Sequence, residues 1–131
     1  MIRFNWLNGL LLLIILPGIA AAVDCRQGAD YYCRAKSETD PQQVIAWLHR
    51  SVEVCPNFNA WYMLGLIYTQ QEEMEPAIAA FSRARAQAVS SATEALALAR
   101  QGELLARSGY LSRALQALKL AERFHPAPVP A

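Results

Sequence analysis

Apolar residues recur along most of the chain at a spacing of three to four residues, and alanine and leucine fill most of these positions. This period is typical of amphipathic helices, whereas a half-buried strand would alternate with a period of two. No useful stretch of the chain shows that alternation. The periodicity, together with the residues that can begin and end helices, predicts six helices, over residues 26–37, 41–54, 58–70, 75–88, 92–107 and 111–124.

Several predicted helix ends carry residues that suit them. Asp40 can cap a helix whose first turn contains Pro41, and Asn57 can cap the helix that follows. Ser91-Ala92-Thr93-Glu94 fits a capping box ahead of a long helix rich in alanine and leucine, and Ser108-Gly109 ends that helix. These ends divide the predicted helices into short-looped pairs.

The first 22 residues differ from the rest. Arg3 is their only charged side chain, an unbroken apolar run covers residues 10–16, Pro17-Gly18 interrupts it, and Ala20–Ala22 follows. This order is typical of a secretory signal peptide with a cleavage site after small residues. The apolar run is shorter than the ~20 residues that a spanning helix needs, although a membrane anchor is the alternative. We therefore expect export to the periplasm or outside the cell, with membrane contact only through a transient signal peptide.

The most specific spacing lies between residue 58 and about residue 91. Trp61-x-x-Leu64-Gly65-x-x-Tyr68 is followed by Ala77-x-x-x-Phe81-x-x-Ala84. This spacing resembles the tetratricopeptide repeat (TPR), a helical hairpin with the pattern W-x2-L-G-x2-Y and then A-x3-F. The large residues of the first helix form one stripe that we expect to pack on Phe81. The small residues, Gly65 and Ala77, allow the two backbones to approach closely.

Two fainter copies flank this one. The downstream copy starts 37 residues later, at Ala95 instead of Phe58, with an insertion near Ser90-Ser91. Leu98 takes the tryptophan position, and the expected core positions of this copy are Gly102, Ala114, Leu118 and Ala121. The upstream copy has Val44, Leu48 and Ser51 as its second-helix stripe, and its first helix lacks the consensus residues. The resemblance implies an all-α protein, a right-handed α-solenoid of about three TPR-like hairpins after an N-terminal signal peptide.

The implied hairpin also selects among the three cysteines. An oxidising compartment favours a disulfide, and three cysteines allow three different single bridges. Cys25 opens the first hairpin and Cys55 closes it, so an antiparallel arrangement brings them together. Cys33 lies about two helical turns further along, ~12 Å at 1.5 Å per residue, which exceeds the ~7 Å limit between bridged Cα atoms. We expect Cys25–Cys55, with Cys33–Cys55 as the alternative if the first helix starts late.

Composition and charge narrow the function classes. Apolar residues make up 54% of the chain and charged residues only 18%, which excludes a disordered chain. Beyond residue 22, eleven basic residues balance eleven acidic ones, which argues against nucleic acid and a polybasic membrane surface as partners. The sequence holds no Ser/His/Asp grouping, no glycine-rich phosphate loop and no CxxC, and its two histidines are far apart. We predict neither an enzyme nor a cofactor or metal protein.

Binding remains as the predicted activity. Stacked helical hairpins present a concave surface formed by their first helices. The residues expected on this surface, the predicted peptide groove, are Asn59, Tyr62, Leu66, Thr69, Gln70, Leu96, Glu103 and Arg107. Chaperone-docking members of the repeat family hold a terminal carboxylate here with lysine and asparagine. Leu66 and Glu103 stand in place of that set, so we do not transfer that activity.

The predicted organisation is a signal peptide over 1–22, a TPR-like repeat domain over 23–125 and a proline-rich tail over 126–131. The exported start and the single strong repeat also resemble the leading part of OmpA-like cell-envelope proteins. We expect a protein–protein interaction module that scaffolds envelope or secretion components through a protein or peptide partner. The alternative is a structural protein that associates with itself, as a homodimer formed through an uncapped end of the stack.

Overall fold

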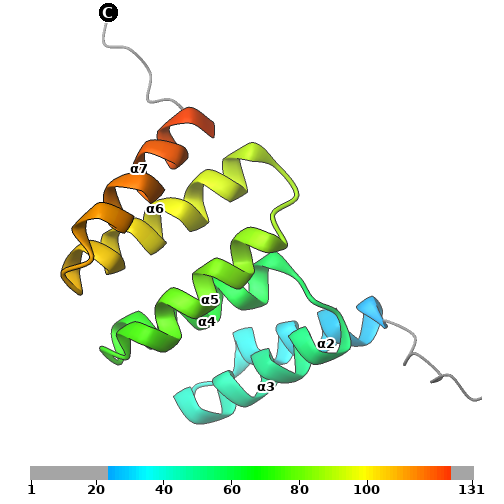
Figure 1. Ribbon diagram of the computed structural model, residues 1–131. Coiled ribbons are helices and arrows are strands. Elements are labelled where there is room, and N and C mark those ends of the chain that lie inside the picture. Colours follow the sequence, from blue (N-terminus) through cyan, green and yellow to red (C-terminus); the bar gives the residue numbers. More distant parts are fainter. Residues whose placement is uncertain (1–23, 125–131) are drawn as a thin grey trace, which may run out of the picture.

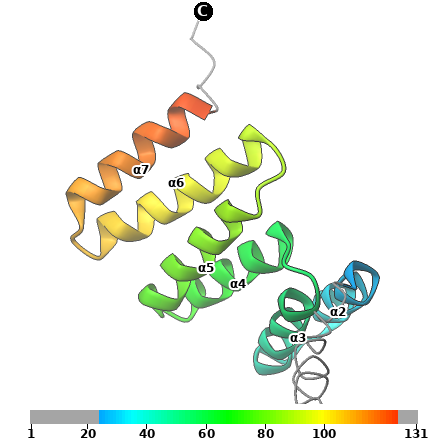
Figure 2. The ribbon, with the colours of Figure 1, turned by 45° about the vertical axis from the view of Figure 1, so that its right-hand side comes forward.

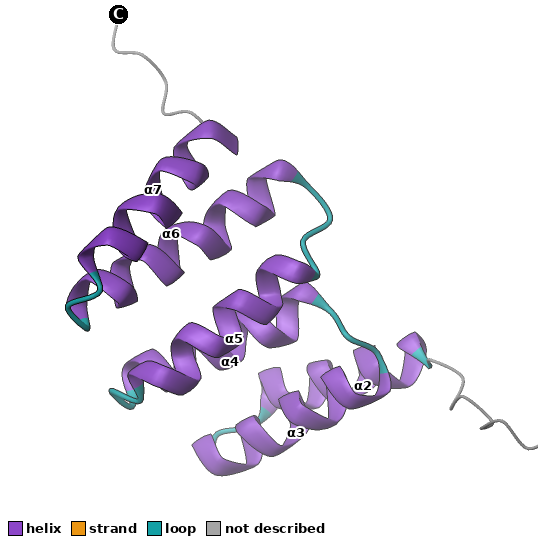
Figure 3. Ribbon diagram, in the orientation of Figure 1, coloured by secondary structure: helices purple, strands orange, loops and turns teal. Residues whose placement is uncertain are grey.

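The computed structural model of the chain describes residues 24–124, and every regular element in that part is a helix (Figures 1 and 3). The elements, in order, are α2 (Cys25–Ser37), α3 (Pro41–Val54), α4 (Phe58–Gln70), α5 (Met74–Ala86), α6 (Ser91–Arg107) and α7 (Leu111–Phe124). All six predicted helices are confirmed, with every end within two residues of its predicted place. The predicted signal peptide, residues 1–22, and the proline-rich tail, residues 126–131, lie outside the described residues.

The helices form three antiparallel hairpins stacked in chain order, α2–α3, α4–α5 and α6–α7 (Figures 1 and 2). Within the stack, α3 packs against α4 and α5 packs against α6. Each hairpin therefore contacts only its neighbours along the sequence, as in a repeat protein. The predicted all-α stack of three hairpins is confirmed for the described part of the chain.

Local hydrogen bonds explain where most helices begin. The Asp40 side chain accepts from the backbone N–H of Gln42 at 3.1 Å, and the Asn57 side chain accepts from that of Ala60 at 2.8 Å, so both predicted caps are present. The capping box of α6 lies one residue earlier than predicted, because Ser90 is the N-cap and Thr93 its partner. Glu94, the predicted partner, instead forms an ion pair with Arg85 across the stack.

Two inter-helix turns repeat the same geometry. After α4, Glu72 has a φ of 61°, and after α6, Gly109 has a φ of 84°. In each turn the following residue donates its backbone N–H back into the helix, from Glu73 to Tyr68 and from Tyr110 to Leu105. This left-handed residue with its back-bond is the Schellman arrangement that ends a helix and reverses the chain. Glycine suits the second turn, whereas glutamate adopts the left-handed conformation in the first at a conformational cost.

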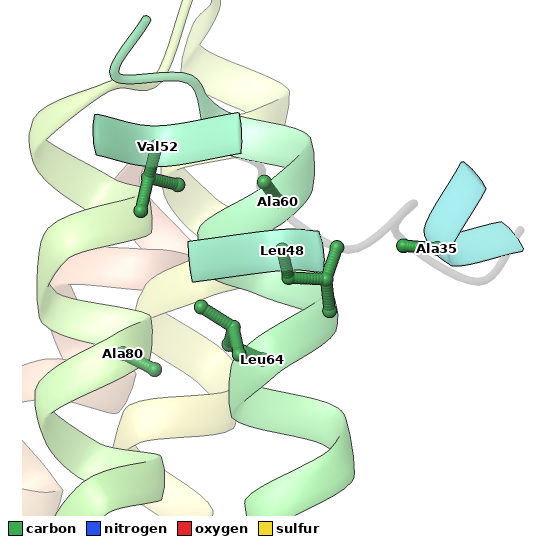
Figure 4. Close-up of a cluster of buried hydrophobic side chains, with 6 residues drawn as sticks. All are labelled: Ala35, Leu48, Val52, Ala60, Leu64 and Ala80. Carbon is green, nitrogen blue, oxygen red and sulfur yellow. The ribbon is translucent and has the colours of Figure 1, made fainter. Parts of the chain in front are cut away.

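The core runs along the stack between the hairpins. The first buried cluster joins residues of α2 to α5 (Figure 4): Ala35, Leu48, Val52, Ala60, Leu64 and Ala80. The second joins α5, α6 and the start of α7: Ala77, Ile78, Phe81, Leu104, Leu105 and Ala114. The third lies inside the last hairpin: Leu98, Ala117 and Ala121. Buried clusters therefore connect each hairpin to the next, as a stack requires when each hairpin packs only on its neighbours.

The predicted close approach of helices at glycine occurs in the second and third hairpins. A Cβ built on Gly65 would lie 2.7 Å from the Phe81 ring, and one built on Gly102 would lie 2.7 Å from Cγ of Leu118. Phe81 is only 1% exposed, whereas Leu118 is 39% exposed. Leu118 therefore departs from its predicted place in the core, because no helix of the described chain covers the outer side of α7.

The disulfide joins Cys25 to Cys55, with 4.8 Å between the Cα atoms, and the predicted pairing is confirmed. The antiparallel hairpin brings the first residue of α2 beside the last turn of α3. Gly28 lies one turn further along α2, where a Cβ would approach Cβ of Cys55 to 2.9 Å. Cys33 is exposed on α2 and unpaired within the described residues.

Candidate interaction surface

The first helices of the second and third hairpins are linked by one arginine. Arg100 on α6 donates from Nε to the Tyr62 hydroxyl on α4 at 3.2 Å, and from Nη1 to Oε2 of Glu103 at 3.2 Å. Two aromatic rings position Tyr62. Its ring is stacked on Phe58, with 5.4 Å between the ring centroids, and stands edge-on to Phe81 at 5.3 Å. The predicted groove residues Tyr62 and Glu103 thus meet through Arg100.

This cluster keeps a charged group near solvent. The Arg100 and Glu103 side chains are 45% and 58% exposed. The hydrogen bond to Tyr62, followed by the interaction with Glu103, raises the pKa of Arg100 above its ordinary value. An arginine guanidinium is cationic at every physiological pH even without this shift. The guanidinium has five N–H donors, and the two used here leave others for an incoming carboxylate or carbonyl oxygen.

Two further predicted groove residues lie in separate cavities between the first and second hairpins. Asn59 lines a cavity of about 230 Å³ beside the disulfide, together with Tyr32 and Asn57. Gln70 lines a cavity of about 420 Å³ at the opposite end of α4, where Val44 and Ile67 form part of the wall. The structure does not bring these two amides to the Tyr62–Arg100 cluster.

Leu96 lies at the end of the stack. It lines a cavity of about 440 Å³ whose walls come from α6 and α7, among them Ala99, Leu118 and Glu122. This residue is 43% exposed. It therefore belongs to the outer surface of the last hairpin, one helical turn before Arg100 on α6.

The remaining predicted groove residues have simpler surroundings. Leu66 is exposed on α4, and Arg107 is exposed in the last turn of α6. Thr69 is half-buried, and its hydroxyl donates to the carbonyl oxygen of Gly65 at 2.7 Å, within its own helix. Its hydroxyl proton is therefore already engaged, while Leu66 offers apolar area and Arg107 a cation.

The predicted repeat-core residues fall into three groups by burial, and Leu118 is the one that is exposed. Most are buried in the clusters described above or at the helix crossings: Leu64, Gly65, Ala77, Phe81, Ala84, Gly102, Ala114 and Ala121. Trp61 and Tyr68 are only half-buried. Both pack at the edge of the core, where they meet α3 and α5.

That edge forms a polar junction which sequence reasoning missed. His49 on α3 shares a hydrogen bond of 3.0 Å between its Nε2 and the Tyr68 hydroxyl, and its ring stands edge-on to Trp61 at 6.2 Å. Arg83 on α5 covers the other part of Trp61, with its guanidinium carbon 4.7 Å from the ring centroid. Burial, and then the negative charge of Glu73, raises the pKa of Tyr68.

Sequence reasoning also missed Arg100 and Gly28. Arg100 stands among several arginines spread along helix faces, and only the position of Tyr62 on the neighbouring helix distinguishes it. Gly28 accepts a 2.7 Å hydrogen bond at its carbonyl oxygen from the buried Ser51 hydroxyl. Gly28 could have been predicted from its position three residues after Cys25, because two helices that cross beside a disulfide leave little room for a side chain.

Within residues 24–124, no three histidine, cysteine, aspartate or glutamate side chains gather in a way that could hold a metal ion. None of the helices in that range combines the length and the apolar character needed to cross a bilayer. No protein-family model matches the chain, and no curated protein matches it with significant similarity.

Proposed function

We propose that the chain is an exported TPR-like protein that binds a protein partner along the surface of α4 and α6, and so scaffolds components of the cell envelope or of secretion. The observation that carries this proposal is the Tyr62–Arg100–Glu103 cluster. It joins the first helices of two hairpins and presents an aromatic ring, a cation and a carboxylate beside the exposed Leu66.

The TPR assignment is supported by contacts that recur at the 37-residue offset. Gly65 faces Phe81 as Gly102 faces Leu118, and the Schellman turn at Glu72 recurs at Gly109. The sequence pattern of residues 58–91 and these two recurring sets of contacts together favour a TPR-like repeat over a generic helical hairpin.

Export is supported by the disulfide and by the order of residues in the leader. Disulfides persist in the periplasm and outside cells and are rare in the cytosol. The Cys25–Cys55 bridge is thus compatible with an oxidising compartment. Fusion of residues 1–30 to an enzyme that is active only outside the cytosol should give activity in a bacterial host, and a mature N-terminus near Val23 would establish cleavage.

The surface suits an extended peptide or a partner helix. Arg100 can donate to a carboxylate or to a main-chain carbonyl, and Leu66, 42% exposed, offers an apolar contact two helical turns from Asn59. Several modest contacts of this kind are typical of peptide recognition by helical surfaces. A ligand with an acidic group beside an apolar side chain would match both.

Selection of peptides from a random display library against the full chain tests the proposal. Selected peptides should lose roughly tenfold or more in affinity for Leu66→Glu or Arg100→Ala, since both remove contacts at the centre of the surface. Val89→Glu is the matched control, because Val89 is 89% exposed in the loop between α5 and α6. Peptides that bind all three variants like the wild type, or a library that yields no binder, would refute the proposal.

Tyr62→Phe separates the two roles of the tyrosine. It keeps the stacking on Phe58 and the edge-on contact with Phe81, and removes only the hydroxyl that accepts from Arg100. The melting temperature of Tyr62→Phe should change little, whereas its affinity for the selected peptides should fall a few-fold, because Arg100 is less well positioned. Tyr62→Ala would mix this effect with loss of packing.

A further inference from the structure

The outer side of the last hairpin is apolar, and none of the helices between residues 24 and 124 covers it. Leu111, Leu115 and Leu118 of α7 are 68%, 53% and 39% exposed, and Leu96 of α6 is 43% exposed. Together with Glu122 they form what we call the end face. Several of these side chains surround the cavity of about 440 Å³, whose floor includes Ala95 and Ala99.

The equivalent face of the second hairpin, 37 residues earlier in the sequence, is covered by a helix. Met74, Ile78 and Phe81 of α5 stand 37 residues before Leu111, Leu115 and Leu118. Ile78 and Phe81 are 9% and 1% exposed, because they form a cluster with residues of α6 and Met74 packs against it. These positions are thus covered by α6 where they lie on α5, whereas on α7 no helix of the described part of the chain covers them.

The charge at the edge of this face is inverted between the two hairpins. Arg85 on α5 pairs with Glu94 in the first turn of α6, with 3.2 Å from Nε to Oε1. Glu122 stands 37 residues after Arg85 and is exposed at the cavity. A helix that covered the end face as α6 covers α5 would therefore need a cation where α6 has Glu94.

The side chains on the first helix of the last hairpin are also smaller than their equivalents in the second hairpin. Ala95 and Ala99 stand where α4 carries the stacked pair Phe58 and Tyr62. The smaller side chains leave the cavity open at a place where Arg100 of α6 covers Tyr62 in the previous hairpin. A covering helix should fill this space with a bulky apolar side chain.

We propose that the end face binds an amphipathic helix of a partner protein, which carries a lysine or arginine in its first turn opposite Glu122 and a bulky apolar residue over the cavity. The partner helix would lie on α7 as α6 lies on α5 and would extend the stack. This inference does not depend on the binding surface of α4 and α6.

A second copy joined head to tail does not fit the same face. The first hairpin precedes the second by 33 residues, which places Asp24 of the α2 cap in register with Glu94. Asp24 would meet Glu122, and two carboxylates repel. Gln27 and Arg34, both exposed, stand where α6 has the buried Ala97 and Leu104. The polar outer side of α2 therefore does not complement an apolar face.

Two synthetic peptides test the proposal against the oxidised full chain. Both have the sequence of residues 90–107, the covering helix in the structure, with Arg100→Phe for the cavity, and one also has Glu94→Lys. Labelled with a fluorophore, they are titrated with the protein and followed by anisotropy. The Glu94→Lys peptide should bind ~5-fold more tightly than its partner, in the range expected for a partly exposed ion pair.

Three protein variants identify the site. Glu122→Lys should reverse the preference between the two peptides. Leu115→Glu should weaken both by roughly tenfold or more, since it places a charge in an apolar contact. Leu66→Glu is the matched control and should bind both peptides like the wild type, whereas it should weaken the peptide binding proposed for α4 and α6 by roughly tenfold or more.

The outcomes separate the two proposals. Reversal of the preference by Glu122→Lys, with loss of binding in Leu115→Glu alone, supports the end-face site whatever happens at α4 and α6. Equal binding of the two peptides, or binding that Leu66→Glu removes and Leu115→Glu keeps, overturns it. A dimer that Leu115→Glu dissociates, together with no peptide binding, also overturns it and assigns the face to a second copy.

Discussion

Replacement of Gly65 by alanine tests the helix crossing on which the second hairpin depends. An added Cβ would lie 2.7 to 2.9 Å from three atoms of the Phe81 ring, distances that real contacts do not show. The ring cannot retreat, because Phe81 is 1% exposed, Tyr62 stands edge-on to it, and residues of α6 pack against it. The helices must therefore separate or the Phe81 side chain must change its rotamer.

Two opposing terms set the magnitude. Overpacking a core costs ~1–3 kcal/mol. Alanine in place of glycine inside a helix returns ~0.5–1 kcal/mol, through the lower conformational entropy of the unfolded chain. Gly65→Ala should therefore destabilise the protein by about 1–2 kcal/mol net, or lower its melting temperature by roughly 5–15 °C for a domain of this size.

Gly102→Ala is the matched comparison inside the same chain. Its added Cβ would also lie 2.7 Å from a side chain, that of Leu118, but Leu118 is 39% exposed and can turn toward solvent. The added Cβ would also lie 3.3 Å from the backbone carbonyl oxygen of Ala114, which has to shift by a few tenths of an ångström. The helix-propensity gain and the small cost of those movements should nearly cancel, so the change should stay within ~1 kcal/mol of zero.

Urea denaturation of the oxidised proteins, followed by circular dichroism at 222 nm, measures both effects. In a Phe81→Leu background, where the second hairpin has the glycine–leucine pair of the third, Gly65→Ala should cost less by about 1 kcal/mol. If Gly65→Ala were as stable as the wild type, or Gly102→Ala cost more, the packing argument would be wrong.

Three further predictions concern the disulfide and the junction near α3. Reduction of Cys25–Cys55 should cost about 3–4 kcal/mol, as expected for a crosslink across 30 residues, and an unchanged melting point in reductant would contradict this. Trp61→Ala should lower the free energy of unfolding by roughly 2–3 kcal/mol, less than the ~3–5 kcal/mol lost with a fully buried aromatic, because Trp61 is only half-buried. An unchanged free energy of unfolding in equilibrium denaturation would contradict this. Burial and Glu73 raise the pKa of Tyr68, so its contribution should be fully present below about pH 10 and lost as the pH rises through the folded value. Stability measured from pH 9 to 11 should therefore fall less in Tyr68→Phe than in the wild type, and parallel curves would rule this out.

The six helices could be predicted because their signals are local. A 3.6-residue apolar period and side-chain caps such as Asp40 and Asn57 act within a few residues of the chain, and the structure contains both caps. The one-residue shift of the capping box to Ser90 has an equally local cause. Thr93 can bond the Ser90 backbone N–H, which leaves Glu94 free to reach Arg85 on the neighbouring helix.

The disulfide needed one step beyond local pattern. Three cysteines allow three bridges, and only an antiparallel hairpin places Cys25 beside Cys55 while Cys33 lies further along α2. That hairpin was inferred from the resemblance of residues 58–91 to a known repeat. The bridge is thus a consequence of the pairing of α2 with α3 and not of the cysteine spacing itself.

The surfaces were decided by the tertiary structure. A helical wheel places Asn59, Gln70 and Leu96 on exposed faces, but the offsets between hairpins distribute them over three separate cavities. Arg100 has no distinguishing sequence context, and its role comes from a contact across 38 residues with Tyr62.

Phe81 and Leu118 show the same limit most clearly. The repeat pattern gives them equivalent positions, yet one is 1% and the other 39% exposed. The amino-acid sequence by itself determined which residues form helices and which stripe of each helix is apolar, because those properties depend on neighbours three and four residues away. Whether a stripe is buried depends on the presence of another helix across it, and that is a property of the stack rather than of the segment.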